Sequence, residues 1–209
     1  MASGQAETTA KATPTIPEPL REAALTLFAE QGYAATGIRD IARRSGMSSA
    51  AMYHYFGSKQ DLLFELMHGI MVRLLDVAHE AIAGVEGPEA RIAALVRCHI
   101  QLIANHNPGT TVNENELRSL DEPNRGVIAG MRDTYEHLWR DEIARGIAAG
   151  IFHVPDARLA SFAAIGMCTS VPKWYAPSGP FSPDQIAEIY ITLIMNMLHG
   201  GERPAAMPG

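Results

Sequence analysis

Glu65 and His68 stand three positions apart in a segment with helical periodicity, the spacing at which di-iron helical bundles place metal ligands. Such bundles are oxidative enzymes, and each needs a second Glu-x-x-His pair together with two further glutamates. The sequence has no second pair. His99 and His106, seven positions apart, have no carboxylate cluster around them. We therefore predict no metal site and no resident cofactor, and a metal-binding helical-bundle enzyme stays the alternative from another functional class.

The remaining nucleophilic groups do not form a catalytic pattern. Cys98 and Cys168 each lie in an apolar helical stretch, where a free thiol packs as a small hydrophobic side chain. Neither has a neighbouring cation at helical spacing that would favour a reactive thiolate. No Ser-His-Asp order, glycine-rich phosphate loop or paired-carboxylate motif stands out. The sequence therefore predicts a protein that is not an enzyme.

Basic side chains are concentrated in one short segment of an acidic chain. The 209 residues have a net charge of −6, whereas residues 37–60 contain the cations Arg39, Arg43, Arg44 and Lys59 against the single acid Asp40. Binding of nucleic acids depends largely on lysine and arginine neutralising phosphates. This asymmetry favours a small DNA-binding head on an acidic body.

The basic segment begins with the pattern of a short amphipathic helix. Thr36 is a good N-cap, because its hydroxyl can accept a hydrogen bond from an amide in the first turn. Ile38, Ile41 and Ala42 then form one apolar face. Gly46 can adopt the left-handed conformation that ends a helix.

A second short helix is expected directly after this turn. Ser48 or Ser49 can cap it, and it is expected to end at Gly57. Met52 and Phe56 lie four positions apart, so both point into the same small core. The outward positions then belong to small or polar residues.

The two helices are expected to form a helix-turn-helix, followed by a third helix that opens at Ser58 and Asp61 with the pattern of a capping box. A helix-turn-helix places its second helix in the major groove, while flanking groups bind phosphates. An ordinary antiparallel helix pair has the same spacing, so spacing alone leaves both possibilities open.

The residues from Ala34 to Leu63, AATGIRDIARRSGMSSAAMYHYFGSKQDLL, resemble the DNA-binding segment of the TetR (tetracycline-repressor) family of transcriptional regulators. The resemblance implies a recognition helix from Ser48 to Phe56, with phosphate contacts through Thr36, Tyr53 and Lys59. Ser49 departs from the lysine or arginine that is frequent at its position. The residues expected to contact DNA are small, polar or basic: Thr36, Arg39, Arg44, Ser48, Ser49, Ala50, Tyr53, His54 and Lys59.

The whole chain has the composition of a soluble globular protein, with 47% hydrophobic and 19% charged residues. It has no apolar run long enough for a membrane span and no signal-peptide pattern, so we expect it in the cytoplasm. We expect a disordered tail over residues 1–15, a head over residues 16–62 and a ligand-binding and dimerisation body over residues 63–203.

No strand pattern competes with helical periodicity, and we predict an all-α fold of about nine helices. The first helix is expected to start at Pro17 or Pro19 and to end at Gly32, and a long helix from Lys59 to about Gly84 joins head to body. Further helices are expected at about 88–106, 111–119, 121–150, 156–170 and 182–200.

The last two helices are unusually apolar for surface elements. They are either buried core or the four-helix interface of a symmetric homodimer, which we favour because a single head binds few phosphates. A dimer would read two half-sites of a palindromic operator. The interface residues expected on these helices are apolar or small: Leu159, Phe162, Ala163, Gly166, Ile186, Ile189, Tyr190, Leu193, Ile194 and Met197.

The central helices contain methionine and aromatic residues with a few polar groups among them, which describes a small-molecule pocket and equally an ordinary helical core. The segments SVPKWYAPSGPFSPD, from Ser170, and ENELRSLDEPNRGVIAGMRDTYEHLWRDEIARGIAAGIF, from Glu114, resemble the ligand domain of TetR-family repressors of fatty-acid, steroid and aromatic-acid catabolism. The candidate ligand residues are Met67, Met71, His99, Asn113, Arg118, Met131, Arg132, Tyr135, Trp139, Met167, Lys173 and Trp174.

The resemblance implies a ligand-relieved repressor whose effector is an acyl-CoA thioester. Lys173, Arg118 or Arg132 would bind the CoA phosphates, and Trp174 would stack on adenine. Lys173 and Trp174 could instead cover the edge of the dimer. A regulator of drug efflux that senses hydrophobic or cationic compounds is the alternative within the same fold, with Glu114 and Glu116 as the acids nearest the pocket.

Overall fold

The computed structural model describes residues 16–104 and 108–200, which form nine α-helices and two short 3₁₀ helices, with no strand in either range. This confirms the predicted all-α fold. The predicted tail and residues 201–203 of the predicted body lie outside the described ranges. In chain order the elements are α1 (Glu18–Gln31), α2 (Ile38–Ser45), α3 (Ser49–Met52), α4 (Lys59–Ile82), α5 (Pro88–Ala104), α6 (Pro108–Asn115), η1 (Leu117–Ser119), α7 (Asn124–Ala148), α8 (Ala157–Thr169), η2 (Val171–Lys173) and α9 (Pro183–His199).

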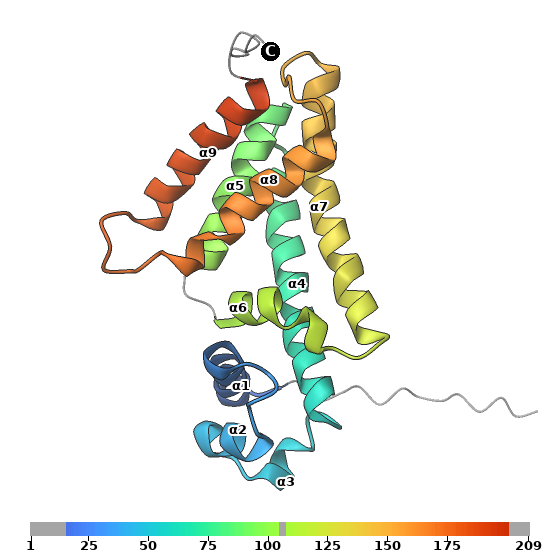
Figure 1. Ribbon diagram of the computed structural model, residues 1–209, viewed down its shortest axis with the longest axis vertical. Coiled ribbons are helices and arrows are strands. Elements are labelled where there is room, and N and C mark those ends of the chain that lie inside the picture. The colour runs from blue at the N-terminus through green and yellow to red at the C-terminus, as the bar shows by residue number, and fades with distance from the viewer. Residues whose placement is uncertain (1–15, 105–107, 201–209) are drawn as a thin grey trace, which may run out of the picture.

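Helices α1, α2 and α3 lie together at one end of the molecule (Figure 1). Their small core contains Phe28, Ile41, Met52 and Phe56, all of which are buried. Helix α2 ends as expected at Gly46, whose φ of 70° is the left-handed conformation that glycine adopts without a Cβ clash. These contacts confirm the helix-turn-helix arrangement of the head.

Two local expectations for the head are wrong. Gly37, not Thr36, is the N-cap of α2, because the Thr36 side chain turns inward and its hydroxyl donates to the carbonyl of Gly32 at 2.8 Å. The second helix also ends early, at Met52, and residues 53–55 form a turn. Phe56 nevertheless reaches the core, so the apolar spacing was a better guide than the expected helix end.

Helix α4 runs from the head into the body as one continuous helix of 24 residues (Figure 1). The domain boundary expected after Leu62 therefore lies inside this helix, and Leu62 and Leu63 are fully buried. Helices α5, α7, α8 and α9 gather at the end opposite the head, while α6 lies across the middle of the molecule. Buried residues of the head and the body form one continuous cluster. Because such a core is closely packed, we expect a shift of α4 to disturb packing in both the head and the body.

Helix α6 starts earlier than the sequence indicated. A turn was expected at residues 107–109 and a helix from Thr111 to Ser119, yet Pro108 and Gly109 already belong to α6, which ends at Asn115. Asn107 lies outside the described residues. Proline suits the first turn of a helix as well as it suits a turn, because the amide it lacks has no partner there. Leu117–Ser119 forms the separate 3₁₀ helix η1.

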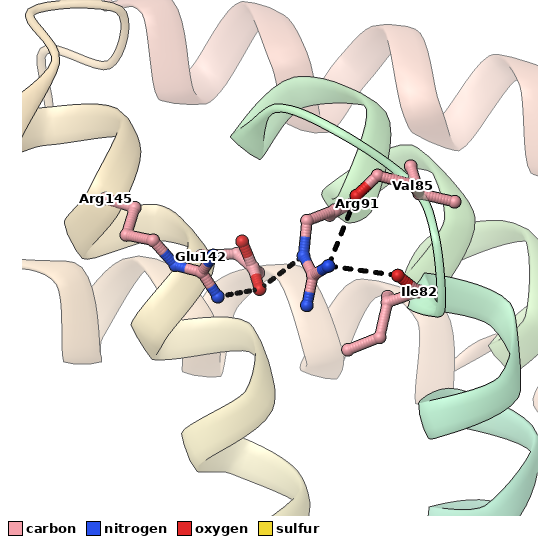
Figure 2. A network of polar contacts seen from close by, with 5 residues as sticks. All are labelled: Ile82, Val85, Arg91, Glu142 and Arg145. Atoms are coloured by element: carbon pink, nitrogen blue, oxygen red, sulfur yellow. Dashed lines mark hydrogen bonds and ion pairs between the residues drawn. The ribbon is translucent and has the colours of Figure 1, made fainter.

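A buried carboxylate fixes the far end of α4 (Figure 2). The guanidinium of Arg91 donates to the carbonyls of Ile82 at 3.0 Å and Val85 at 3.2 Å, and its Nε donates to Glu142 Oε1 at 2.7 Å. Arg145 donates to the same carboxylate oxygen. Glu142 is only 2% exposed as a side chain, so this charge-assisted network ties the ends of α4 and α5 to α7.

Within residues 16–104 and 108–200, we find no helix that is both long enough and apolar enough to cross a membrane.

Candidate DNA-binding head and ligand cavity

The outer face of the head presents the side chains of α3 and of the turn after it. Ser48 Oγ caps α3 by accepting the amide of Ala51 at 3.1 Å. Ser48, Ala50, Tyr53 and His54 are exposed, and Ser49 is half-buried. The small residues at the start of α3 leave room for close approach to base edges. The rings of Tyr53 and His54, directly after α3, are exposed and can contact DNA.

The basic residues of α2 are exposed and only weakly engaged. Arg39 is exposed, Arg43 contacts Asp40 at 2.9 Å, and Arg44 contacts Glu30 at 3.3 Å. Exposed ion pairs contribute little to stability, so these arginines can exchange a carboxylate for a phosphate at small cost.

Thr36 and Lys59 make contacts within the head itself. Thr36 is 1% exposed, and its hydroxyl is bonded to backbone carbonyls. Lys59 Nζ donates to the carbonyls of Tyr33 at 2.5 Å and Thr36 at 2.7 Å, and it lies 4.0 Å from the centre of the Tyr33 ring. Partial burial lowers the pKa of Lys59, against the opposing charge of Glu116. In this conformation both residues fasten the loop between α1 and α2.

A polar joint connects this loop to the body. Glu116 follows α6 directly, and its carboxylate accepts the amide of Tyr33 at 3.1 Å and the hydroxyl of Ser119 at 2.5 Å. Gln60, in the first turn of α4, donates to Tyr33 Oη at 2.8 Å and to the carbonyl of Ser119 at 2.7 Å. Its Oε1 accepts the amide of Asp121 at 3.1 Å. Head, α4 and the segment after α6 therefore meet in one hydrogen-bonded joint.

A cavity with two adjoining lobes lies in the body, with volumes of about 220 Å³ and about 420 Å³. Both lobes are bordered by α4, α5 and α6 and by the end of α8, and α7 closes the larger one. The residues that border both lobes are Leu74, His99, Asn113, Glu114, Thr169 and Lys173. The wall formed by α4 also includes Ile70 in the smaller lobe and Met71 in the larger one, so the helix that leads to the head is part of the cavity.

Polar groups stand deep in this apolar wall. His99 Nδ1 and Tyr135 Oη are 2.7 Å apart, and burial lowers the pKa of His99 to about 4, so the imidazole is neutral at pH 7. The side-chain amide of Asn113 donates to Met71 Sδ at 3.0 Å, and Arg132 donates to the backbone carbonyl of Asn113. Sulfur is a weak acceptor, so the amide of Asn113 is poorly satisfied.

The cavity includes about half of the expected ligand residues, namely Met71, His99, Asn113, Arg132, Tyr135 and Lys173. The others lie elsewhere. Met67 and Trp139 are buried in the core, Arg118 is exposed on η1, and Met131 and Met167 are half-buried outside the wall. The Trp174 ring stacks on Tyr190 and is half-exposed. Helical periodicity identifies an inward face but not which inward residues border open space.

Other residues of the wall were not expected from the sequence. Leu74, on the predicted long helix, was not among the expected ligand residues, and Thr111 was expected only as the start of a helix. Thr169 gave no signal. Phe162 was assigned to the dimer interface, yet it also borders the larger lobe. In retrospect, a single polar residue near the end of an otherwise apolar helix, such as Thr169 in α8, could have been taken as a candidate cavity residue.

The metal and thiol candidates can now be placed. Groups of three or more metal-binding side chains do not occur within residues 16–104 and 108–200, the region that includes Glu65 and His68, while His106 lies outside it. Cys98 and Cys168 are buried free thiols. Burial raises the pKa of Cys98 to about 11 and that of Cys168 to about 12, so both thiols stay protonated.

The expected dimer residues divide into two groups. Leu159, at 68% exposure, and Leu193, at 48%, are exposed on α8 and α9. Phe162, Ala163, Gly166 and Ile189 are exposed as well, and Tyr190 and Met197 are half-buried. Ile186 and Ile194 are instead buried within their own chain, which corrects their assignment to an interface. The remaining expected residues are apolar or small and are exposed or half-buried on α8 and α9.

Comparisons with known proteins agree with this architecture. KstR2 of Mycobacterium tuberculosis, an "HTH-type transcriptional repressor", is 28% identical over 180 residues that cover 84% of this chain and 89% of that protein. The solved structure of the TetR-family regulator PfmR from Thermus thermophilus has a TM-score of 0.78 at 32% identity, covering 90% of this chain and all of that one. AibR, solved with isovaleryl coenzyme A and operator DNA, shares the fold, with a TM-score of 0.78 at 23% identity over 83% of this chain and 95% of that one.

Family comparisons cover both parts of the chain. Residues 20–66, which hold the helix-turn-helix, match "Bacterial regulatory proteins, tetR family". Residues 85–198, more than half of the chain, match "Tetracyclin repressor-like, C-terminal domain". The helix-turn-helix head, the continuous α4 and the helical body with its cavity are thus accounted for together, and the protein belongs to the TetR family of DNA-binding transcriptional regulators.

Proposed function

We propose that this TetR-family regulator is a homodimeric repressor that leaves a palindromic operator when a CoA thioester fills the cavity of the body. The observation that supports this most directly is the position of Ile70, Met71 and Leu74. All three lie on α4 and border the cavity, and α4 begins in the head. A ligand in the cavity therefore contacts the same rigid element that positions α3.

The proposed DNA contacts follow the exposed face of the head. Ser48, Ser49, Ala50, Tyr53 and His54 would approach base edges or the sugar-phosphate backbone. The outward arginines Arg39 and Arg44 would bind phosphates. In the described conformation Lys59 and Thr36 support these contacts indirectly, by holding the loop before α2.

The proposed ligand class rests on the cavity and on the relatives. The wall is mainly apolar, and Lys173 stands exposed at its border, where a base can meet a CoA phosphate. Trp174, one residue further on, has a half-exposed ring that can stack on adenine. AibR was solved with isovaleryl coenzyme A, and KstR2 is named a repressor. Both names fit a repressor that responds to CoA thioesters.

Acidic residues at the cavity favour one second candidate, a regulator that senses hydrophobic cations. Glu114 borders both lobes, and Asp133 borders the larger one. Glu116 does not belong to this group, because its carboxylate is used in the joint with the head.

The test is release from an operator that the full-length chain selects from random duplex DNA, followed by fluorescence anisotropy. We expect isovaleryl-CoA or cyclohexanecarbonyl-CoA to raise the dissociation constant for DNA by at least about tenfold, within the usual range of allosteric coupling. Free CoA is the control and should change the constant less than about twofold. Thioesters no more effective than free CoA would contradict the proposed ligand class, and release by tetraphenylphosphonium would support the second candidate.

A further inference from the structure

Three polar side chains from three different helices border the cavity. They are His99 on α5, Asn113 on α6 and Arg132 on α7, and all three border the larger lobe. His99 and Asn113 also border the smaller lobe. We refer to these residues as the polar triad. Around them the larger lobe combines apolar residues, such as Met71, Leu74 and Ile165, with further polar ones.

Each member of the polar triad has one buried atom that lacks a hydrogen-bond partner within the described residues. These atoms are His99 Nε2, Asn113 Oδ1 and Arg132 Nε. A buried polar group without a partner destabilises a folded protein, and native structures contain few of them. Two further atoms of this kind, Trp139 Nε1 and Glu142 Oε2, belong to residues that border neither lobe. The gathering of the other three beside one cavity is the observation that points to a ligand.

The partnered atoms of the polar triad fix what the remaining atoms can do. His99 Nδ1 is engaged with Tyr135 Oη, which leaves Nε2 of the neutral ring as donor or acceptor according to the tautomer. Arg132 donates through a terminal nitrogen to the backbone carbonyl of Asn113 and keeps Nε–H as a donor. Asn113 Oδ1 is an acceptor. The free atoms have almost no accessible surface, so the inference requires the imidazole or the amide to rotate when a ligand binds.

We propose that the acyl group bound in the cavity bears an oxygen function, a ring or chain carbonyl or hydroxyl, that hydrogen-bonds to His99, Asn113 and Arg132. This inference rests on the proposed function and narrows its ligand class from acyl-CoA thioesters in general to oxygenated ones. A carbonyl accepts from Arg132 Nε–H and His99 Nε2–H, and a hydroxyl can in addition donate to Asn113 Oδ1. A plain hydrocarbon group leaves all of these atoms unpaired.

The surrounding charges favour a neutral oxygen function over a second carboxylate. Among the described residues of the larger lobe, the acids Glu114, Asp133 and Glu136 stand against the bases Arg132 and Lys173. Glu136 is already engaged, because Ser161 Oγ donates to it at 2.5 Å and Arg140 lies 3.6 Å away. With Glu136 engaged, the remaining acids Glu114 and Asp133 balance the bases Arg132 and Lys173, so the lobe has no net positive charge that would favour a second carboxylate.

The first experiment compares matched ligands on the full-length chain and its selected operator. The probes are cyclohexanecarbonyl-CoA and its ring ketones and ring alcohols, and the readout is the concentration that gives half-maximal release. At least one oxygenated thioester should act at a concentration about tenfold lower than the parent, since a site built for hydrogen bonds penalises an analogue that lacks them. A parent as effective as every oxygenated probe would overturn the inference and leave the proposed CoA ligand intact.

The second experiment uses variants of the polar triad. Asn113→Leu and His99→Phe should reduce the advantage of the oxygenated probe to less than about twofold, whereas Met67→Leu, in the core outside the cavity, should preserve it. Retention of the full advantage in both triad variants would overturn the assignment of these residues.

The third experiment needs no ligand, so it also applies if no thioester releases DNA. Asn113→Leu should leave the melting temperature of the ligand-free protein unchanged or raise it, because it removes an unpaired buried atom. Ser161→Ala, which removes the partner of a buried carboxylate, should lower it by several degrees. A loss in Asn113→Leu as large as in Ser161→Ala would assign Asn113 a purely structural role and overturn the inference.

Discussion

His99 is a buried base whose neutral form is built into the packing of the body. It is 4% exposed, its ring lies edge-on to Trp139 with centroids 6.2 Å apart, and its Nδ1 is engaged with Tyr135. Burial lowers its pKa from the usual 6.5 to about 4. Burial disfavours the charged form of this ring, so protonation and the folded state oppose each other.

This opposition predicts a specific loss of stability in mild acid. Between about pH 6.5 and pH 4 the unfolded chain binds a proton at His99 and the folded chain does not, so the free energy of unfolding falls as pH falls. Relative to His99→Phe, the wild-type protein should lose on the order of 2 to 3 kcal/mol between pH 7 and pH 4.5 in urea unfolding. His79→Gln, at an exposed histidine, is the control. Parallel pH profiles for the wild-type protein and His99→Phe would show that His99 is not the group responsible.

Lys59 shows how a residue's role depends on its neighbours rather than its type. The resemblance to the TetR family implied that Lys59 contacts a phosphate. In the structure its ammonium is bonded to the carbonyls of Tyr33 and Thr36 and lies over the Tyr33 ring. Both acceptors come from a loop distant in sequence, and a one-dimensional pattern has no means of indicating them.

At the scale of elements, α4 is held at both ends by polar contacts of different kinds. At its far end, the buried Glu142 receives Arg91 and Arg145, and Arg91 also holds the carbonyls of Ile82 and Val85. At its near end, Gln60 belongs to the joint with η1 and the loop after α1. The cavity lies between these two points. The neutral hydrogen bonds of Gln60 at the near end are weaker than the ionic network at the far end. We therefore expect a ligand that displaces the middle of α4 to move its near end, in the head, more than its far end.

Among the described residues of this joint, Glu116 provides the carboxylate that links the segment after α6 to the loop of the head. Its bonds to the Tyr33 amide and the Ser119 hydroxyl are charge-assisted. Glu116→Ala should lower the free energy of unfolding by about 1.5 to 3 kcal/mol and speed hydrogen exchange at the Tyr33 amide. The neighbouring Glu114→Ala, at an exposed position, should change stability by less than about 0.5 kcal/mol. Equal effects in the two variants would remove Glu116 from the joint.

Helix ends were predictable where the chemistry that forms them is local. Asp156 Oδ1 accepts the Leu159 amide at 2.7 Å, as the sequence indicated, and Ser182 with Gln185 forms a capping box at the start of α9, where the sequence predicted a helix start but not this box. The end of α2 at Gly46 was found for the same reason. Each of these features involves residues within four positions of one another, which is the range over which sequence patterns are informative.

Features decided by tertiary packing were missed or misplaced. Thr36 was a sound local N-cap, but burial of its side chain allows hydrogen bonds to Leu27 and Gly32 to prevail. Ile186 and Ile194 share an apolar helix with Leu193, and only packing shows that the first two face their own chain. The cavity was predictable as a mixture of residue types, yet its borders depend on where side chains fail to fill space, and this is a property of the assembled helices.

At the scale of the whole molecule, α8 and α9 leave an apolar face uncovered. Leu159, Phe162, Ile189 and Leu193 are exposed on it, and the small Ala163 and Gly166 permit close approach of another helix. One head contacts few phosphates, whereas two heads held by a common body contact two major grooves. A second copy of the chain on this face satisfies both requirements.

This assembly predicts that exposed apolar residues of α8 and α9 control DNA binding without contacting DNA. Leu159→Glu and Leu193→Glu should each remain folded, because surface substitutions change stability by only about 0.5 kcal/mol. Each should be monomeric, because dimerisation would bury an unpaired carboxylate. Each should weaken binding to the selected operator by at least about tenfold, because half of the phosphate contacts are lost. Val127→Glu, at an exposed apolar residue of α7, is the control and should remain dimeric. Sedimentation velocity measures the assembly and anisotropy the affinity, and a dimeric Leu193→Glu variant that retains full operator affinity would place the interface elsewhere on the body.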